Sequence, residues 1–82
     1  MKITKTDGRC NICGSRIREM RRDWQLSQEM LAMKLQLAGM DATQKLVSQM
    51  ETGKRAITDY ELQCLADVLE VSVSELLGRE AE

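Results

Sequence analysis

The chain has 82 residues, with 12 Lys and Arg against 13 Asp and Glu, and its formal net charge is −1. A chain of this length forms one small domain and leaves little room for a deep substrate cavity, which argues against a complex enzyme. The sequence contains no His, so it lacks the commonest general acid/base and the His-containing zinc sites. One Trp, one Tyr and no Phe argue against a module that stacks unpaired bases on aromatic rings.

The charges are unevenly distributed along the chain. Residues 1–22 carry seven basic residues against two acidic ones, a net charge of +5. Residues 23–57 are neutral, and residues 58–82 carry one basic residue against seven acidic ones, a net charge of −6. This asymmetry predicts a basic front that faces a polyanion and an acidic back. The alternative is two solvated faces.

Nothing in the sequence predicts export or membrane insertion. The first ten residues are charged and lack an apolar stretch, and no run approaches the 18 apolar residues of a membrane-spanning helix. The three Cys are an odd number, and in a chain that is not exported they are most simply reduced thiols. We therefore expect a cytoplasmic protein.

Apolar residues recur with the 3.6-residue period of an α-helix from Ile17 onward, and no strand pattern competes with it. The first helix is expected from Ser15 to about Asp23, with Ile17, Met20 and Trp24 facing one core.

The second helix is expected between an N-cap at Ser27 and a stop at Gly39. Its apolar residues are Met30, Leu31, Met33, Leu35 and Leu37. We interpret the Met residues on or near apolar faces as adaptable core filler. They are Met20, Met30, Met33 and Met50.

A third, short helix is expected to end near Glu51, with Val47 and Met50 facing inward. Asp41 and Thr43 are both capping residue types, and Thr43 is the favoured cap. The outward positions are hydrogen-bonding residues plus one Lys, an unusual set for a face that merely solvates. They are Gln44, Lys45, Ser48 and Gln49.

Two capping boxes predict the last two helices. Thr58 with Glu61 opens a fourth helix, and Ser72 with Glu75 opens a short fifth one that carries Leu76 and Leu77. The sequence thus predicts an all-α domain of five short helices.

These elements carry an ordered set of motifs. They are Arg-Ile-Arg-Glu-Met-Arg-Arg (16–22), Leu-Ser-Gln-Glu-Met-Leu-Ala (26–32), Val-Ser-Gln-Met-Glu-Thr-Gly-Lys-Arg (47–55), Leu65-Ala66 and Val-Ser-Val-Ser-Glu-Leu-Leu (71–77). The set resembles the Cro/phage-repressor type helix-turn-helix family, also called the XRE family. The resemblance covers residues 14–78 and implies a lambda-repressor-like DNA-binding domain. Residues 1–13 are then a flexible basic lead-in and residues 79–82 a C-terminal tail.

The resemblance implies that the third helix, about residues 43–51, enters the major groove of double-stranded DNA, usually in a two-fold dimer. Gln44 and Gln49 can each pair with an adenine edge, and Lys45 suits guanine. We expect these three side chains to read bases.

Other side chains are implied to position the DNA backbone or to support the fold. Gln28, at the start of the second helix, reaches a phosphate or supports the reading side chains, and Arg21 and Glu51 form a structural ion pair. The expected backbone and positioning residues are Ser27, Gln28, Thr43, Ser48, Lys54 and Arg55.

The sequence departs from the family pattern between the second and third helices. Family members commonly have a tight turn there, whereas in this sequence the connection over residues 35–42 is several residues longer. These most simply lengthen the second helix by about one turn, 3.6 residues. Leu37 and Met40 then cover core or a partner, and Asp41 is expected to cap a helix because it would repel phosphate.

Cys10 and Cys13 have the spacing of half a zinc site or of a redox dithiol. The only other Cys is Cys64, so one chain cannot complete a site of four Cys and His ligands. Two chains could pool a Cys₄ site, or the pair could be a redox switch; the simpler interpretation is incidental thiols, with Cys13 packing under the first helix. No metal or cofactor is predicted.

The sequence therefore predicts a sequence-specific, double-stranded DNA-binding transcriptional regulator, a repressor that binds an inverted-repeat operator as a homodimer. No enzyme, membrane or small-molecule function is expected. Tyr60 either approaches a phosphate or caps the core edge. For the dimer interface the candidate is the fifth helix, unless Leu76 or Leu77 completes the monomer core. The competing hypothesis is a helix-turn-helix protein-interaction module with weak or no DNA binding.

Overall fold

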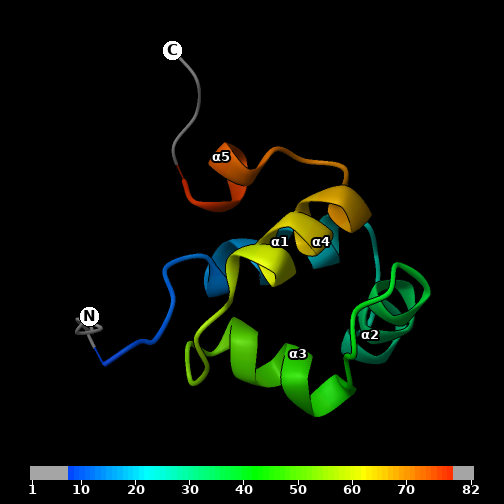
Figure 1. Ribbon diagram of the computed structural model, residues 1–82, viewed down its shortest axis with the longest axis horizontal. Helices are drawn as coiled ribbons and strands as arrows, with labels where there is room; N and C mark the ends of the chain where they lie inside the picture. The colour runs from blue at the N-terminus through cyan, green and yellow to red at the C-terminus, as the bar shows by residue number, and fades with distance from the viewer. Residues whose placement is uncertain (1–7, 79–82) are drawn as a thin grey trace.

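The computed structural model describes residues 8–78, which form five α-helices. They are α1 (Gly14–Asp23), α2 (Gln28–Leu37), α3 (Gln44–Glu51), α4 (Asp59–Leu69) and α5 (Val73–Leu76), as Figure 1 shows. The expected all-α architecture of five short helices is confirmed. No helix in this part of the chain is long and apolar enough to cross a bilayer.

Four helices begin where local capping chemistry places them. A side-chain hydroxyl of the N-cap residue accepts a backbone N–H three residues further on at Ser27, Thr43, Thr58 and Ser72. Both predicted capping boxes form, with Glu61 and Glu75 bonding back to their N-cap N–H groups. Each pair satisfies N–H groups that a helix terminus would otherwise leave unpaired.

The start of α1 differs from the prediction. The helix begins at Gly14, one residue before Ser15, and its N-cap residue Cys13 makes no side-chain cap bond. Asn11 takes that function, because its Oδ1 accepts the Gly14 N–H at 2.8 Å. A Cβ at Gly14 would collide with the Met50 carbonyl oxygen, so the glycine allows α1 to approach the end of α3 closely.

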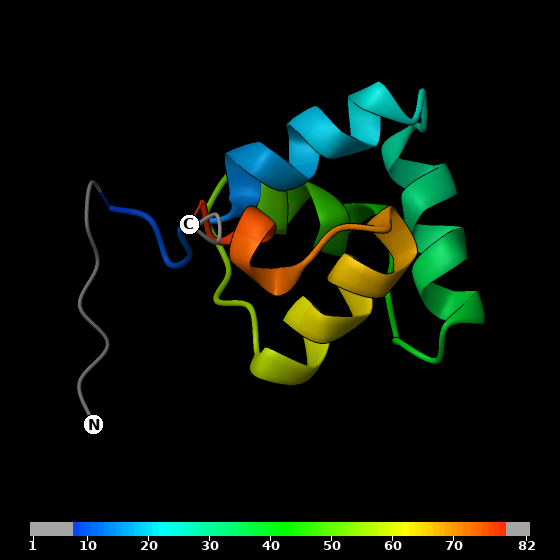
Figure 2. The same ribbon diagram turned by 90° about the horizontal axis from the view of Figure 1, so that it is seen from above.

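The core lies between the five helices. Figure 2 shows α2 running across one end of the domain, beside α3 and α4. The largest fully buried side chains are Ile17, Leu31, Leu35, Val47, Met50, Leu65, Leu69 and Leu76. Because Leu76 is fully buried and Val73 and Leu77 are half-buried, α5 completes the monomer core and has little apolar surface left for a partner.

Several apolar side chains expected in the core lie at the surface. Trp24 is 49% exposed, and its indole Nε1 donates to the Leu69 carbonyl oxygen at 3.0 Å, so the ring covers the edge of the core. Met30 and Met33 are also exposed, which corrects their assignment as core filler. Met50 is fully buried and Met20 packs partly against the core, as predicted.

The helix α2 ends at the predicted stop, and the connection to α3 follows it. The helix continues to Leu37, and Gly39 follows with a positive φ of 96° that ends it. The Gln36 amide then donates to the carbonyl oxygen of the buried Ala42. Met40 packs against the core, whereas Leu37 points into solvent.

Residues 8–13, which the sequence assigned to a flexible lead-in, are held on the domain. The Cys10 N–H donates to the Gly53 carbonyl oxygen at 2.7 Å. The Asn11 amide donates to the carbonyl oxygens of Met50 at 3.0 Å and Arg55 at 2.8 Å. This segment therefore braces the C-terminal end of α3 and the loop that follows it. The division of the chain at residue 14 stays a prediction, and residues 1–7 and 79–82 lie outside the described part.

Candidate nucleic-acid interface

The outer surface of α3 brings together the side chains expected to read bases. Gln44 and Lys45 are exposed in the first turn, while Ser48 and Gln49 are half-buried one turn later. Since residues four apart lie above one another on a helix, the four form two adjacent rows. Figure 1 shows α3 at the edge of the domain, with α1 and α4 on its inner side. Because Val47 and Met50 of the same helix are fully buried in the core, these rows lie on the outer side of α3.

A buried ion pair anchors the C-terminal end of α3. Arg21 of α1 donates from Nε to Glu51 Oε2 at 2.6 Å and from Nη2 to Oε1 at 3.1 Å. The Arg21 and Glu51 side chains are 10% and 2% exposed. The third guanidinium nitrogen donates to the Leu26 carbonyl oxygen at 2.7 Å. The predicted pairing is therefore present, and hydrogen bonding to Glu51 raises the pKa of Arg21 despite the opposing effect of burial.

Gln28 links this ion pair to the outer surface of α3. Its amide nitrogen donates to Glu51 Oε1 at 3.1 Å, and its amide oxygen accepts from Gln44 Nε2 at 2.6 Å. A continuous chain of hydrogen bonds thus runs from buried Arg21 through Glu51 and Gln28 to exposed Gln44. These contacts show Gln28 bonded to Gln44, and the two functions expected of Gln28 toward DNA stay predictions.

The two capping residues near this surface are already engaged with their own helices. Ser27 Oγ accepts the Met30 N–H at 3.0 Å, and Thr43 Oγ1 accepts the Leu46 N–H at 3.1 Å. Each hydroxyl hydrogen remains available as a donor, and both side chains lie at the exposed start of a helix. The starts of α2 and α3 therefore both present polar groups to a ligand on this side.

The two basic residues of the loop after α3, both expected to contact phosphate, have different surroundings. Lys54 is exposed. The Arg55 guanidinium instead forms two bonds of 2.8 Å with the carboxylate of Glu61 in α4 and a third, of 3.0 Å, with the Ala56 carbonyl oxygen. The hydrogen bonds between Arg55 and Glu61 are the main reason why the pKa of Glu61 is lowered and the pKa of Arg55 is raised. Arg55 therefore connects the loop to α4 in this structure.

The predicted basic front is not a single face in the part of the chain that the structure describes. Arg21 is buried against Glu51, and the Arg16 guanidinium lies over Gly78 after α5. Arg9 lies over Gly53, beside Lys54. The sequence pattern gives no sign that Arg9 lies near α3, because the bonds of Cys10 and Asn11 to residues 50–55 bring the N-terminal segment there.

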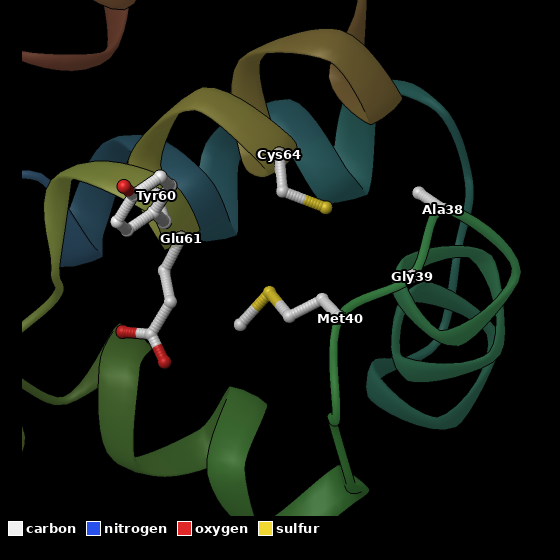
Figure 3. A pocket seen from close by; sticks show the side chains of 6 residues that line it. All are labelled: Ala38, Gly39, Met40, Tyr60, Glu61 and Cys64. Atoms are coloured by element: carbon white, nitrogen blue, oxygen red, sulfur yellow. The ribbon is translucent and has the colours of Figure 1, made fainter.

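A small pocket of about 210 Å³ lies between α4 and the α2–α3 connection. Its lining residues are Ala38, Gly39, Met40, Tyr60, Glu61 and Cys64, and Figure 3 shows Met40 pointing into the gap below α4. Tyr60 is 87% exposed and so does not cap the core edge. Its approach to a phosphate stays a prediction.

The three cysteines are free thiols. Cys13 is buried under α1, and burial raises the pKa of the Cys13 and Cys64 thiols. Within residues 8–78 no three or more Cys, Asp or Glu side chains gather to hold a metal ion. The Cys13 thiol therefore behaves as a small apolar group in the core. The Cys₄ site shared by two chains and the redox switch stay hypotheses.

Comparison with known proteins identifies the fold. No protein-family profile and no curated protein matches the sequence. A solved structure of the P22 c2 repressor protein, in complex with synthetic operator 9T in the presence of Tl⁺, matches 85% of this chain and 98% of its own with a TM-score of 0.67 and 24% sequence identity. The chain has the fold of the P22 c2 repressor. The predicted lambda-repressor-like helix-turn-helix architecture is therefore confirmed, and the likeness to the P22 c2 repressor is one of fold.

Proposed function

We propose that this protein is a sequence-specific, double-stranded DNA-binding transcriptional regulator that represses by occupying an operator. The observation that carries the proposal is the outer face of α3, where Gln44 is tied through Gln28 to the buried ion pair. The groove of B-DNA admits one helix, and a Gln amide matches the donor and acceptor of an adenine edge. That a repressor of the same fold was crystallised with a synthetic operator supports the proposal.

In this function, three side chains of α3 read base edges: Gln44, Lys45 and Gln49. The side chains that contact and position the DNA backbone are Ser27, Gln28, Thr43, Ser48 and Lys54. Arg55 could contact the DNA backbone only by breaking its bonds to Glu61. We therefore assign it to holding the loop after α3 on α4. Two copies bind an inverted repeat, with the α3 helices about 34 Å apart, or roughly one turn of DNA.

The deciding experiment is selection of bound duplexes from a random DNA pool at about 0.15 M salt, where non-specific phosphate binding is already weakened. Enrichment of an inverted repeat with half-site centres near 10 base pairs, or a multiple, supports both the regulator and the dimer. Without enrichment from folded, reduced protein, the proposal is wrong.

Variants then separate readout from positioning. Gln44→Ala, Lys45→Ala and Gln49→Ala should each lose about 1–3 kcal/mol of discrimination at one base pair. Lys54→Ala should weaken binding to all sequences alike and flatten the salt dependence by about one unit. Gln63→Ala, on the exposed face of α4, is the matched control and should change neither.

A protein-interaction module is the second candidate. It is favoured by the neutralisation of Arg21 and Arg55 by carboxylates and by the net charge of −1, since strong DNA binders usually carry a basic excess. Titration with bulk duplex DNA at low salt distinguishes the two. A pure interaction module forms no salt-sensitive complex, whereas a DNA-binding regulator does.

A further inference from the structure

The helix α2 is apolar on two opposite faces. Its inner face packs Leu31, Ala32 and Leu35 into the core, where all three are buried. Its outer face carries Met30, Met33 and Leu37, which are 48%, 62% and 89% exposed. A helix that is apolar all round is normally covered on all sides. The outer face, which we define as Met30, Met33 and Leu37, therefore has the composition of a contact surface.

The spacing of the outer face is that of a coiled-coil seam. Met30, Met33 and Leu37 follow one another at intervals of three and four residues, as the a, d and a positions of a heptad do. Glu29 then occupies the g position on one side of the seam and Lys34 the e position on the other, and both are exposed. These two flanks of the outer face carry opposite charges.

We propose that the outer face of α2 binds the same face of a second copy of this chain, with the two α2 helices parallel. In a parallel pair the g residue of one helix lies beside the following e residue of the other. Glu29 then meets Lys34 of the partner subunit, and two-fold symmetry repeats the contact. An antiparallel pair places like flanks together and loses both attractions.

The area of the outer face sets the strength of this contact. Three side chains over two helical turns bury less than the roughly 800 Å² per partner of a standard interface, so we expect a dissociation constant on the order of 10–100 µM. The fifth helix offers little competing surface, because its Leu76 is fully buried and its Val73 and Leu77 are half-buried.

The parallel arrangement also differs from the dimer required by an inverted repeat. Figure 1 looks along α2 and shows α3 lying across it, and Figure 2 shows the same crossing from above. A half-turn about an axis parallel to α2 therefore points the outer faces of the two α3 helices in opposite directions. The α2 contact leaves each DNA-reading surface free and is independent of the operator dimer.

Sedimentation equilibrium of the full, reduced chain, without DNA and from about 10 to 500 µM, tests the proposal. The chain should show a monomer–dimer equilibrium that Leu37→Glu weakens at least about tenfold, because a carboxylate then lies in the apolar seam. Gln63→Glu on α4 is the control and should leave the equilibrium unchanged. Circular dichroism confirms that each variant is folded, which is expected because Leu37 makes no part of the core.

A charge swap tests the parallel orientation. Glu29→Lys or Lys34→Glu alone should weaken the dimer roughly tenfold, since each creates two like-charge contacts. The double variant should recover to within about threefold of the natural chain, and a mixture of the two single variants should form heterodimers.

Three results overturn the proposal. A monomer at every concentration means that the outer face takes another protein or none; a dimer insensitive to Leu37→Glu means a different surface; a double variant no tighter than the single ones excludes the parallel pair. Because the experiment contains no DNA, none of these results bears on the proposed operator binding.

Discussion

Replacing Glu51 with Leu should destabilise the domain by about 3–5 kcal/mol. The substitution leaves the Arg21 guanidinium, 10% exposed, without the two carboxylate bonds that balance its burial. Breaking a buried pair by removing one partner leaves an uncompensated charge, which is the origin of that magnitude. A domain of 82 residues has roughly 4–12 kcal/mol of stability in total. Urea unfolding followed by circular dichroism should therefore show a large shift of the midpoint.

The double variant Arg21→Met with Glu51→Leu separates pairing from packing. Replacing both charges with apolar groups of similar size is often nearly neutral, so the double variant should recover most of the loss. It still loses the bond from Arg21 to the Leu26 carbonyl oxygen and the bond from Gln28 to Glu51, for a residual deficit of about 1–2 kcal/mol. A loss below about 1 kcal/mol for Glu51→Leu alone, or a double variant as unstable as the single one, would show that the Arg21 charge does not depend on Glu51.

Three further predictions concern the parts around α3. Asn11→Ala should destabilise the domain by about 1–3 kcal/mol in urea unfolding, because it removes three bonds that brace α1 and the end of α3; an unchanged midpoint contradicts this role. Glu61→Gln should lower stability at neutral pH. The difference from the natural chain should shrink as pH falls below the unfolded Glu value of about 4.3 and disappear below the lowered folded pKa of Glu61, because the paired carboxylate contributes its full stability above the unfolded value and loses it as it is protonated in the folded state; a pH-independent difference contradicts the pairing with Arg55. Gly53→Ala should destabilise the domain more than Gly39→Ala in thermal unfolding. Both glycines have a positive φ, but only at Gly53 would an added Cβ lie 2.8 Å from the Arg9 Cγ. Equal losses would show that the Arg9 side chain moves aside.

The helix starts could be predicted from the sequence because capping is a local interaction. Ser27, Thr43, Thr58 and Ser72 each bond to a backbone N–H only three residues away. A pattern within a few residues therefore contains all the information that places these ends. The start of α1 was missed by one residue because its N-cap residue Cys13 makes no cap bond, and Asn11 reaches the Gly14 N–H from a position that a contact with Met50 of α3 holds in place.

Side-chain partners across the fold could not be predicted from periodicity. Met33 and Leu35 are both apolar residues of one helix, and only the packing of α2 against α3 and α4 decides that Leu35 is buried and Met33 exposed. Likewise, the pairing of Arg55 with Glu61 depends on how the loop returns to α4. The Arg21–Glu51 pair was expected only through the resemblance to a family, because its partners lie 30 residues apart.

In the candidate site, too, the local features could be predicted from the sequence and the contacts across the fold could not. The sequence placed Gln44, Lys45 and Gln49 on one short helix, and their outward or half-buried positions agree with that. Their roles toward DNA stay predictions. The hydrogen bonds that hold Gln44 through Gln28, and the approach of Arg9 to the loop after α3, could not be predicted from the sequence, because they depend on how the helices pack.

The bond from Gln44 to Gln28 bears on the entropy of binding. A free Gln side chain on a helix surface samples several rotamers, and fixing such a side chain at an interface costs about 0.5–1.5 kcal/mol. Gln44 is restrained before any ligand arrives, by a partner that is itself anchored on Glu51. The folding of the domain therefore bears the ordering cost, and a duplex that accepts Gln44 in this rotamer meets a side chain with little freedom left to lose.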